Sequence, residues 1–159
     1  MARFNALPQT EAEQRLSTCL ANRRWAAEVA SRRPYPEVQS LLAAASAALN
    51  RLTDADWLAA LEAHPRIGEK GGDAPDSSRR EQSRAMQSAA ETLDAIDAGN
   101  RQYEQRFGHV FLIRASGRSA EEILSELRRR MKNDAAAELA EARRELAQIA
   151  AERLSRLVS

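Results

Sequence analysis

Hydrophobic residues recur along most of the chain at the three- and four-residue spacing of amphipathic helices. Residues that cap helices precede several of these stretches, and Pro or Gly follows their ends. The pattern predicts helices that begin near Thr10 (with Glu13 as a capping box), Asn22, Pro36, Thr53, Ser78, Asn100, Ser119 and Asp134. The helix from Ser78 is expected to end at Gly99, and the short helix from Asn100 at Gly108.

Two stretches interrupt this helical pattern. The span from Ile67 to Ser78 contains several glycines and a proline, which is typical of a loop. The run His109–Ile113 is short, apolar and partly β-branched, so we expect it to be extended and buried. Loops on a rigid scaffold often carry function, which draws attention to the first of these stretches.

Composition supports an all-α fold. The chain of 159 residues has 32 Ala against 13 Val, Ile and Thr together, and Ala is the best helix former. No repeat, low-complexity stretch or linker divides the sequence. We therefore predict a single compact bundle of about eight helices, forming one domain over residues 1–159.

Charge and cysteine content exclude some classes of function. Lys and Arg number 24 against 23 Asp and Glu, and the 22 arginines are scattered among acids, so we expect neither nucleic-acid binding nor membrane binding. Most arginines, including the Arg128–Arg130 triple, are expected to be solvated. Cys19 is the one cysteine and is expected in the core; two histidines make a zinc site improbable on composition. The N-terminus has no signal-peptide pattern, and a cytoplasmic location is expected.

His64 is a candidate for chemistry near neutral pH. It lies three residues after Leu61, where Pro65 should end a helix and a glycine-bearing loop follows. Histidine titrates near neutral pH, and the end of an element beside a loop suits an active site. A histidine that is merely satisfied in the core is the competing interpretation.

Ser78 and Glu81 have the spacing of a capping box. That structural interpretation is the default. A helix start also presents N–H groups that can bind an anionic ligand, which Glu81 and Gln82 could then meet.

Arg153 continues a row of apolar positions in the last helix: Leu139, Ala142, Leu146 and Ile149. A guanidinium in such a row is costly unless it is paired or binds an anion. It could equally reach solvent or pair with an acid such as Glu81.

Several segments together resemble one known family. They are His64-Pro65-Arg66-Ile67-Gly68, Ser78-x-x-Glu81-Gln82, Phe107 to Ile113, Phe4 to Pro8, Trp25-Ala26, Arg33-Pro34-Tyr35, Gly117-Arg118-Ser119 and Ile149 to Leu154. In this order they resemble the 2-oxo-4-hydroxy-4-carboxy-5-ureidoimidazoline (OHCU) decarboxylase family. Many members have Phe-Pro where this chain has His109-Val110.

The resemblance implies an all-helical, commonly homodimeric, cofactor-free enzyme that converts the ureidoimidazoline to (S)-allantoin in urate degradation. It implies catalytic roles for His64, Glu81 and Arg153. It also implies that substrate contacts come from these residues: Pro65, Ser78, Glu81, Gln82, His109, Val110, Phe111, Leu112 and Ile113. Two other hypotheses remain open from the residues alone: a non-enzymatic helical interaction module, and a ureide hydrolase on the same scaffold.

Overall fold

A computed structural model describes residues 1–64 and 90–159. Within these ranges every regular element is an α-helix, and the prediction of an all-α fold is confirmed. The helices are α1 (Ala2–Asn5), α2 (Gln9–Ser17), α3 (Arg23–Ser31), α4 (Val38–Leu49), α5 (Asp54–Glu62), α7 (Ala90–Phe107), α8 (Ala120–Arg130) and α9 (Ala135–Leu157). None of these described helices has the length and apolar character needed to cross a bilayer.

Side-chain caps set four of the helix starts as predicted, including that of α9, where Asp134 Oδ1 accepts a hydrogen bond from the Ala137 amide at 2.8 Å. The Asn22 side chain accepts a hydrogen bond from the Trp25 amide, and Ser119 accepts one from the Glu122 amide. Thr53 begins α5 with a reciprocal capping box. Each such cap typically stabilises a helix by about 1 kcal/mol, so the local sequence fixes where these helices begin.

Two predicted helices begin one or two residues away from the expected position. Helix α2 begins at Gln9 with Pro8 as its N-cap, because the Pro8 carbonyl already accepts the Ala12 amide at 3.0 Å. Thr10 is therefore inside the first turn and caps nothing. Helix α4 begins at Val38 after an extended Glu37, later than the expected start at Pro36.

The expected break at Gly99 is wrong. Helix α7 runs through Gly99 without interruption and ends before Gly108, whose φ of 77° suits glycine. A Cβ added at Gly99 would lie 2.6 Å from Leu127 Cδ2 in α8. The glycine therefore permits close packing of two helices and does not terminate one.

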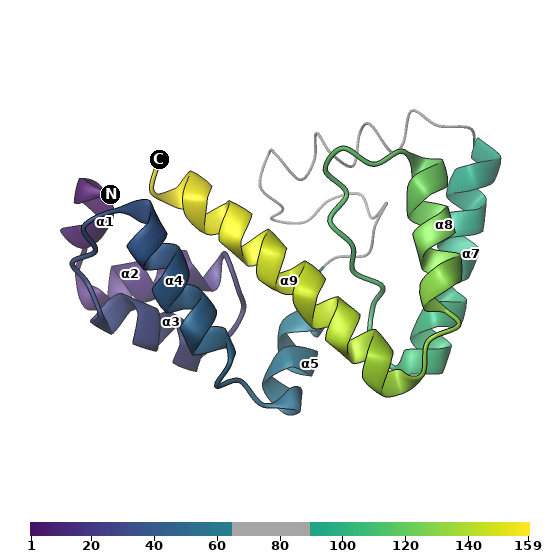
Figure 1. Ribbon diagram of the computed structural model, residues 1–159, viewed down its shortest axis with the longest axis horizontal. Coiled ribbons are helices and arrows are strands. Elements are labelled where there is room, and N and C mark those ends of the chain that lie inside the picture. Colours follow the sequence, from purple (N-terminus) through teal and green to yellow (C-terminus); the bar gives the residue numbers. More distant parts are fainter. Residues whose placement is uncertain (65–89) are drawn as a thin grey trace. The chain divides into compact units, whose positions relative to one another are not determined.

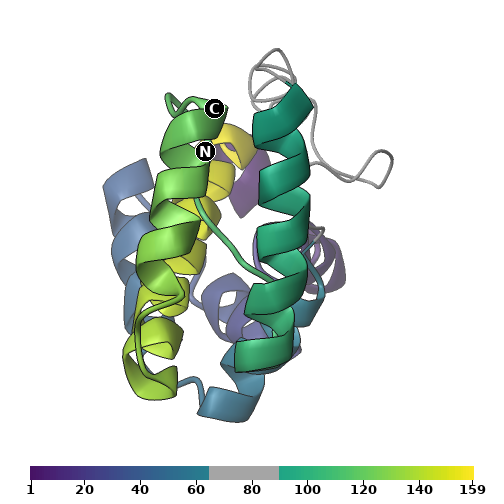
Figure 2. The same ribbon diagram turned by 90° about the vertical axis from the view of Figure 1, so that its right-hand side faces the viewer.

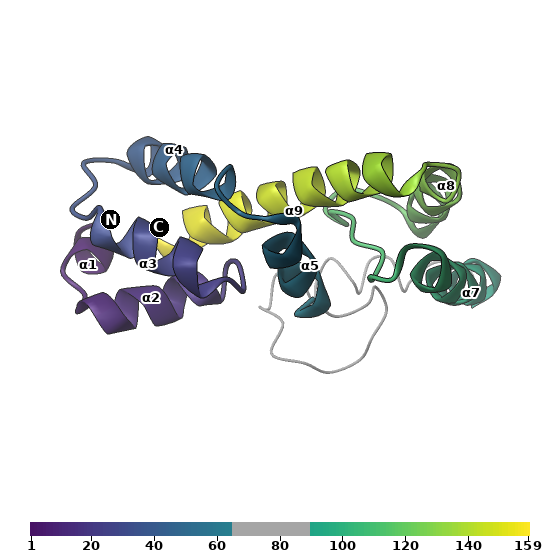
Figure 3. The ribbon, with the colours of Figure 1, turned by 90° about the horizontal axis from the view of Figure 1, so that it is seen from below.

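The chain divides into two compact units, 1–63 with 146–159 and 64–145, called here unit 1 and unit 2. In unit 1, α2 packs along α3, and α3 along α4 (Figure 3). Its interior is apolar and includes Leu16, Trp25 and Leu41. The Trp25 indole N–H donates to the Ala45 carbonyl at 3.0 Å, which satisfies its one polar group.

Unit 2 contains α7, α8 and the first part of α9. Helices α7 and α8 lie side by side and point the same way, because an extended segment returns from the end of α7 to the start of α8 (Figures 1 and 2). Its apolar cluster consists of Ile96, Tyr103, Phe111, Ile113, Ala120, Ile123 and Leu127. The prediction for His109–Ile113 is confirmed: the run is not helical, and all but the partly exposed Val110 are buried.

Candidate active site

His64 directly follows α5, the short helix whose start the Thr53 capping box fixes. The helix ends at Glu62 and Ala63 is its C-cap, as predicted from the proline at position 65. The His64 side chain is partly exposed, and the residue is the first of unit 2. It therefore lies at the end of an element, where the sequence analysis placed it.

Four predicted site residues lie outside the described residues: Pro65, Ser78, Glu81 and Gln82. Their roles stay predictions.

Arg153 lies in the part of α9 that belongs to unit 1, but beside the buried row and not within it. The fully buried positions follow a strict four-residue spacing: Ala142, Leu146, Ala150 and Leu154. Arg153 is partly exposed, and its Nη1 lies 3.5 Å from the Thr18 carbonyl, at the limit of a hydrogen bond. Its guanidinium is thus in a less apolar place than its sequence position indicated.

Cys19 is buried beside this arginine, as expected of a core residue. Burial raises the pKa of its thiol to about 11, although the positive charge of Arg153 opposes the shift. The thiol is therefore protonated near neutral pH and is a poor nucleophile.

The backbone of the predicted substrate segment His109–Ile113 is held by side chains. Among the described residues no backbone–backbone hydrogen bond involves this run. Instead, Arg130 Nη1 donates to the Leu112 carbonyl at 2.7 Å, and the Arg114 amide donates to Glu145 Oε2 at 3.0 Å. His109 Nδ1 lies 3.1 Å from the Val110 carbonyl. Side chains of α8 and α9 thus hold the backbone of this segment and of the residue that follows it.

The side chains of the same run point into the core of unit 2. Phe111 and Ile113 belong to its apolar cluster, and the Phe111 ring packs edge-on against Tyr103 at 5.3 Å. His109 packs edge-on against the same tyrosine at 5.5 Å. Any contact of this run with a ligand is therefore more readily made by its backbone than by these buried side chains.

Arg130 lies deeper than the sequence predicts. The charged triple Arg128–Arg130 indicates a solvated surface, yet Arg130 is 1% exposed. It ends a row with Ile123 and Leu127 at helical spacing, and this row is the signal that could have identified it. Its Nε donates to Glu138 Oε1 at 2.8 Å, so a fully buried ion pair lies beneath the extended segment.

Glu138 is the acceptor at the centre of this buried group. The Tyr103 hydroxyl also donates to its Oε1 at 2.5 Å, and Asn133 Nδ2 donates to its Oε2 at 3.1 Å. Burial and the neighbouring carboxylate raise the pKa of Tyr103 well above its ordinary value, so the tyrosine remains a hydrogen-bond donor.

Some segments that carried the family resemblance have a structural role in unit 1. Asn5 and Tyr35 exchange two hydrogen bonds, with Asn5 Nδ2 donating to the Tyr35 carbonyl at 2.8 Å and the Tyr35 amide donating to Asn5 Oδ1 at 2.9 Å. Arg33 Nη1 donates to the carbonyls of Phe4 at 2.9 Å and Leu7 at 2.7 Å. These residues join the N-terminal helices to the turn after α3.

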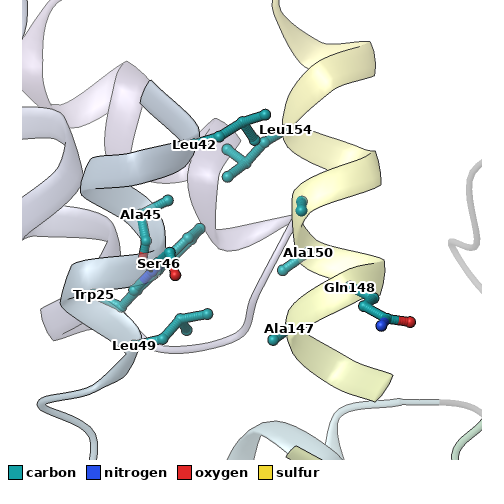
Figure 4. Close-up of a pocket in the computed structure, with 10 residues that line it drawn as sticks. Trp25, Leu42, Ala45, Ser46, Leu49, Ala147, Gln148, Ala150 and Leu154 are labelled. Atoms are coloured by element: carbon teal, nitrogen blue, oxygen red, sulfur yellow. Dashed lines mark hydrogen bonds between the residues drawn. The ribbon is translucent and has the colours of Figure 1, made fainter. Parts of the chain in front are cut away.

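A cavity of about 190 Å³ lies in unit 1, where α4 faces the last part of α9 (Figure 4). Its lining is mostly apolar and includes Trp25, Leu42, Leu49 and Leu154, and no predicted site residue lines it. Across residues 1–64 and 90–159, no three His, Cys, Asp or Glu side chains are grouped as metal ligands would be.

Together these features define an all-helical protein in which a side-chain-anchored extended segment joins two parallel helices. The profile of the OHCU decarboxylase family matches residues 5–155. The chain therefore belongs to the OHCU decarboxylase family.

Similar proteins agree with this assignment. The chain is 31% identical over 153 residues to the uric acid degradation bifunctional protein TTL of Arabidopsis thaliana, covering 92% of this chain and 47% of that protein. It is 26% identical over 160 residues to the uric acid degradation bifunctional protein of Bacillus sp. (strain TB-90), covering 99% of this chain and 32% of that one. The chain thus spans half or less of the length of these two relatives.

Two solved structures share the fold. One is an OHCU decarboxylase crystallised in the presence of (S)-allantoin, with a TM-score of 0.79, 29% identity, and coverage of 91% of this chain and 96% of that one. The other is an (S)-allantoin synthase with a TM-score of 0.77 and 17% identity, matched over 99% of this chain and 53% of that one; at this identity it supports the fold alone.

Proposed function

We propose that this chain decarboxylates OHCU to (S)-allantoin without a cofactor, as a carboxy-lyase of urate degradation. The observation that carries the proposal is the family match over residues 5–155, which includes the segments around His64 and His109–Ile113. The fold match to an OHCU decarboxylase, which extends over nearly all of that chain, supports it.

The chemistry needs little from the protein beyond positioning and proton transfer. The bond between the ring carbon and its carboxylate breaks, carbon dioxide leaves, and the bonding electron pair passes into the unsaturated ring. A proton added to one face of the ring then gives the S product. Because the substrate delocalises its own charge, orientation and electrostatic stabilisation are the contributions required of the protein.

The predicted site residues divide these tasks. Arg153, with N–H groups at the helix start predicted at Ser78, holds anionic and carbonyl oxygens of the substrate. His64 acts as general acid and base at the reacting atoms, and Glu81 orients the histidine or the ureido group. Pro65, Gln82 and the backbone of His109–Ile113 complete the substrate contacts.

A circular dichroism assay tests this function. Fresh OHCU is generated in the cuvette from urate by oxidation and hydrolysis, and the signal of (S)-allantoin is followed with time. We expect rapid formation of the S enantiomer with the wild type, and no acceleration with His64→Asn, because asparagine keeps a polar side chain at this position but cannot take up or release a proton near neutral pH. Spontaneous racemic product with the wild type would refute the proposal.

The matched control for His64→Asn is Glu62→Gln, an exposed position two residues earlier at the end of α5. It should leave the rate unchanged. Full activity of His64→Asn would remove the histidine from the mechanism while leaving the function intact. Consumption of OHCU without release of carbon dioxide would favour the ureide hydrolase alternative.

We also propose that the protein forms a homodimer, because the family it belongs to is commonly homodimeric. Light scattering coupled to size-exclusion chromatography measures the mass directly. A mass twice the 17.6 kDa of the chain supports the dimer, and the monomer mass contradicts it.

A further inference from the structure

We propose that the buried Arg130–Glu138 pair positions the backbone of His109–Ile113 for the substrate, an inference that rests on the proposed function. Both residues act through the segment, so they are positioning residues and not catalytic ones.

The first argument is the geometry of Arg130. Its guanidinium faces three groups at once: Nε and Nη2 bond to Glu138 Oε1, and Nη1 bonds to the Leu112 carbonyl at 2.7 Å. The guanidinium carbon also lies 4.6 Å from the centre of the Phe111 ring. Two consecutive residues of the segment are thus fixed by one planar, rigid group, one through its carbonyl and one through its ring.

The second argument is the cost of the pair. Arg130 is 1% and Glu138 0% exposed, and such a pair must lose its hydration on folding. Apolar residues of similar volume often stabilise a protein equally well or better. Apolar residues could not donate a hydrogen bond to the Leu112 carbonyl. The buried pair therefore contributes a fixed position for the backbone of the segment.

The third argument is the kind of bond that reaches the backbone of the segment from the described residues. Among the described residues, the segment has no backbone–backbone hydrogen bond that could hold it in register. Side chains instead bond to the backbone at Leu112, from Arg130, and at Arg114, the residue that follows the segment, from Glu145. Tyr103 and Asn133 each donate a hydrogen bond to Glu138. They therefore fix the carboxylate that in turn fixes the guanidinium of Arg130.

The test replaces the pair by apolar residues, Arg130→Met with Glu138→Leu, so that no unpaired charge is left behind. The matched control is Arg129→Met with Glu126→Leu. This neighbouring pair lies in α8 at 2.8 Å, is partly solvated, and leaves Asn133 and Glu138 untouched.

Two measurements are made on both double variants. Amide hydrogen exchange of peptides that cover 109–114 reports the anchoring directly, and kinetics of (S)-allantoin formation report its effect on catalysis. For the buried pair we expect a folded protein whose segment exchanges at least about tenfold faster. We expect kcat/KM to fall by roughly 10-fold to 100-fold, with a rise in KM, because small displacements of contacting groups are enough for such losses.

Unchanged exchange or unchanged kcat/KM in the folded buried-pair variant would overturn the proposal, as would equal effects in the control. If the buried-pair variant does not fold, Arg130→Lys replaces it: one ammonium group keeps the charge beside Glu138 but cannot reproduce the planar fork, and the same loss is expected. If the wild type forms no (S)-allantoin, the proposed function fails, and the exchange data alone decide whether Arg130 anchors the segment.

Discussion

The two units of the chain fill their interiors differently. In unit 1 the buried side chains are apolar, and its buried Trp25 and Tyr35 each donate to a backbone carbonyl. The buried polar and charged residues of the described chain all belong to unit 2: Asn100, His109, Arg130 and Glu138. The first arrangement derives its stability from burial of apolar surface. The second uses directional side-chain bonds to hold a segment that makes no backbone–backbone hydrogen bond within the described part of the chain.

The comparison teaches where precision is needed. Apolar packing tolerates exchanges that conserve volume, because dispersion contacts have little directionality. A buried charge network does not, because each member leaves another unsatisfied when it is removed. The following changes test this difference between the units.

The largest effect is expected for Glu138→Leu alone. It leaves the Arg130 guanidinium buried without its counter-charge, and should lower the free energy of unfolding by about 3–5 kcal/mol. Urea unfolding followed by circular dichroism measures the change. The volume-conserving Leu41→Met in unit 1 is the control, with an expected loss under about 1.5 kcal/mol. Similar losses in the free energy of unfolding for Glu138→Leu and Leu41→Met would contradict the proposed difference between the two interiors.

A pair of tyrosine variants compares single hydrogen bonds in the two interiors. Tyr103→Phe removes a donor to the Glu138 carboxylate and should cost about 1.5–3 kcal/mol, since bonds to charged groups are the stronger ones. Tyr35→Phe removes a donor to the Val29 carbonyl and should cost about 0.5–1.5 kcal/mol. Both are measured by urea unfolding, and a larger loss for Tyr35→Phe would contradict the comparison.

Alkaline pH should act on unit 1 through Cys19. Its pKa is raised from 9.0 to about 11 by burial, so the stability linked to the protonated thiol is present below pH 9 and is lost as pH rises toward 11. By pH 10 this loss amounts to about 1 kcal/mol. Unfolding curves at pH 8 and pH 10 should differ less for Cys19→Ala than for the wild type. An equal pH effect in both proteins would exclude the thiol as its source.

The smallest effects are expected at exposed ion pairs, where the units should behave alike. Arg15 pairs with Glu11 in unit 1, and Arg101 pairs with Asp97 in unit 2, each one helical turn apart. Arg15→Gln and Arg101→Gln should each change the free energy of unfolding by about 0–0.5 kcal/mol. Addition of 1 M salt should remove even that difference, and a large effect at either site would show that surface charge also separates the units.

The sequence predicted local features of the fold well, because their causes are local. Asn22 and Thr53 cap the helices they precede, and Gly108 ends α7. The failures have causes that are distant in the sequence. Gly99 looks like a helix terminator until Leu127 of another helix is placed against it. Pro8 begins α2 without a side-chain cap, which a search for capping residues passes over.

The candidate site shows the same division. The position of His64 at the end of a helix could be predicted because Pro65 follows it. How deeply a charged side chain is buried could not be predicted in the same way. The sequence predicts a place within a buried row for Arg153, which only borders that row, and a solvated place for Arg130, which ends such a row. The difference lies in the partner, since Glu138 enters from another helix and makes burial of Arg130 tolerable.

The anchoring of the extended segment has a consequence for how the protein is made. The Leu112 carbonyl bonds to Arg130, which is 18 residues later in the chain, and the Arg114 amide bonds to Glu145, which is 31 residues later. Neither bond can form before its later partner has been synthesised. The ribosome therefore adds the residues of the segment before the residues whose side chains bond to it. The intervening loops must close before these two hydrogen bonds can form. A nascent chain that stops before α9 already contains Tyr103 and Arg130, but it lacks Glu138 and Glu145, so the complete set of these contacts forms only when the last helix has been made.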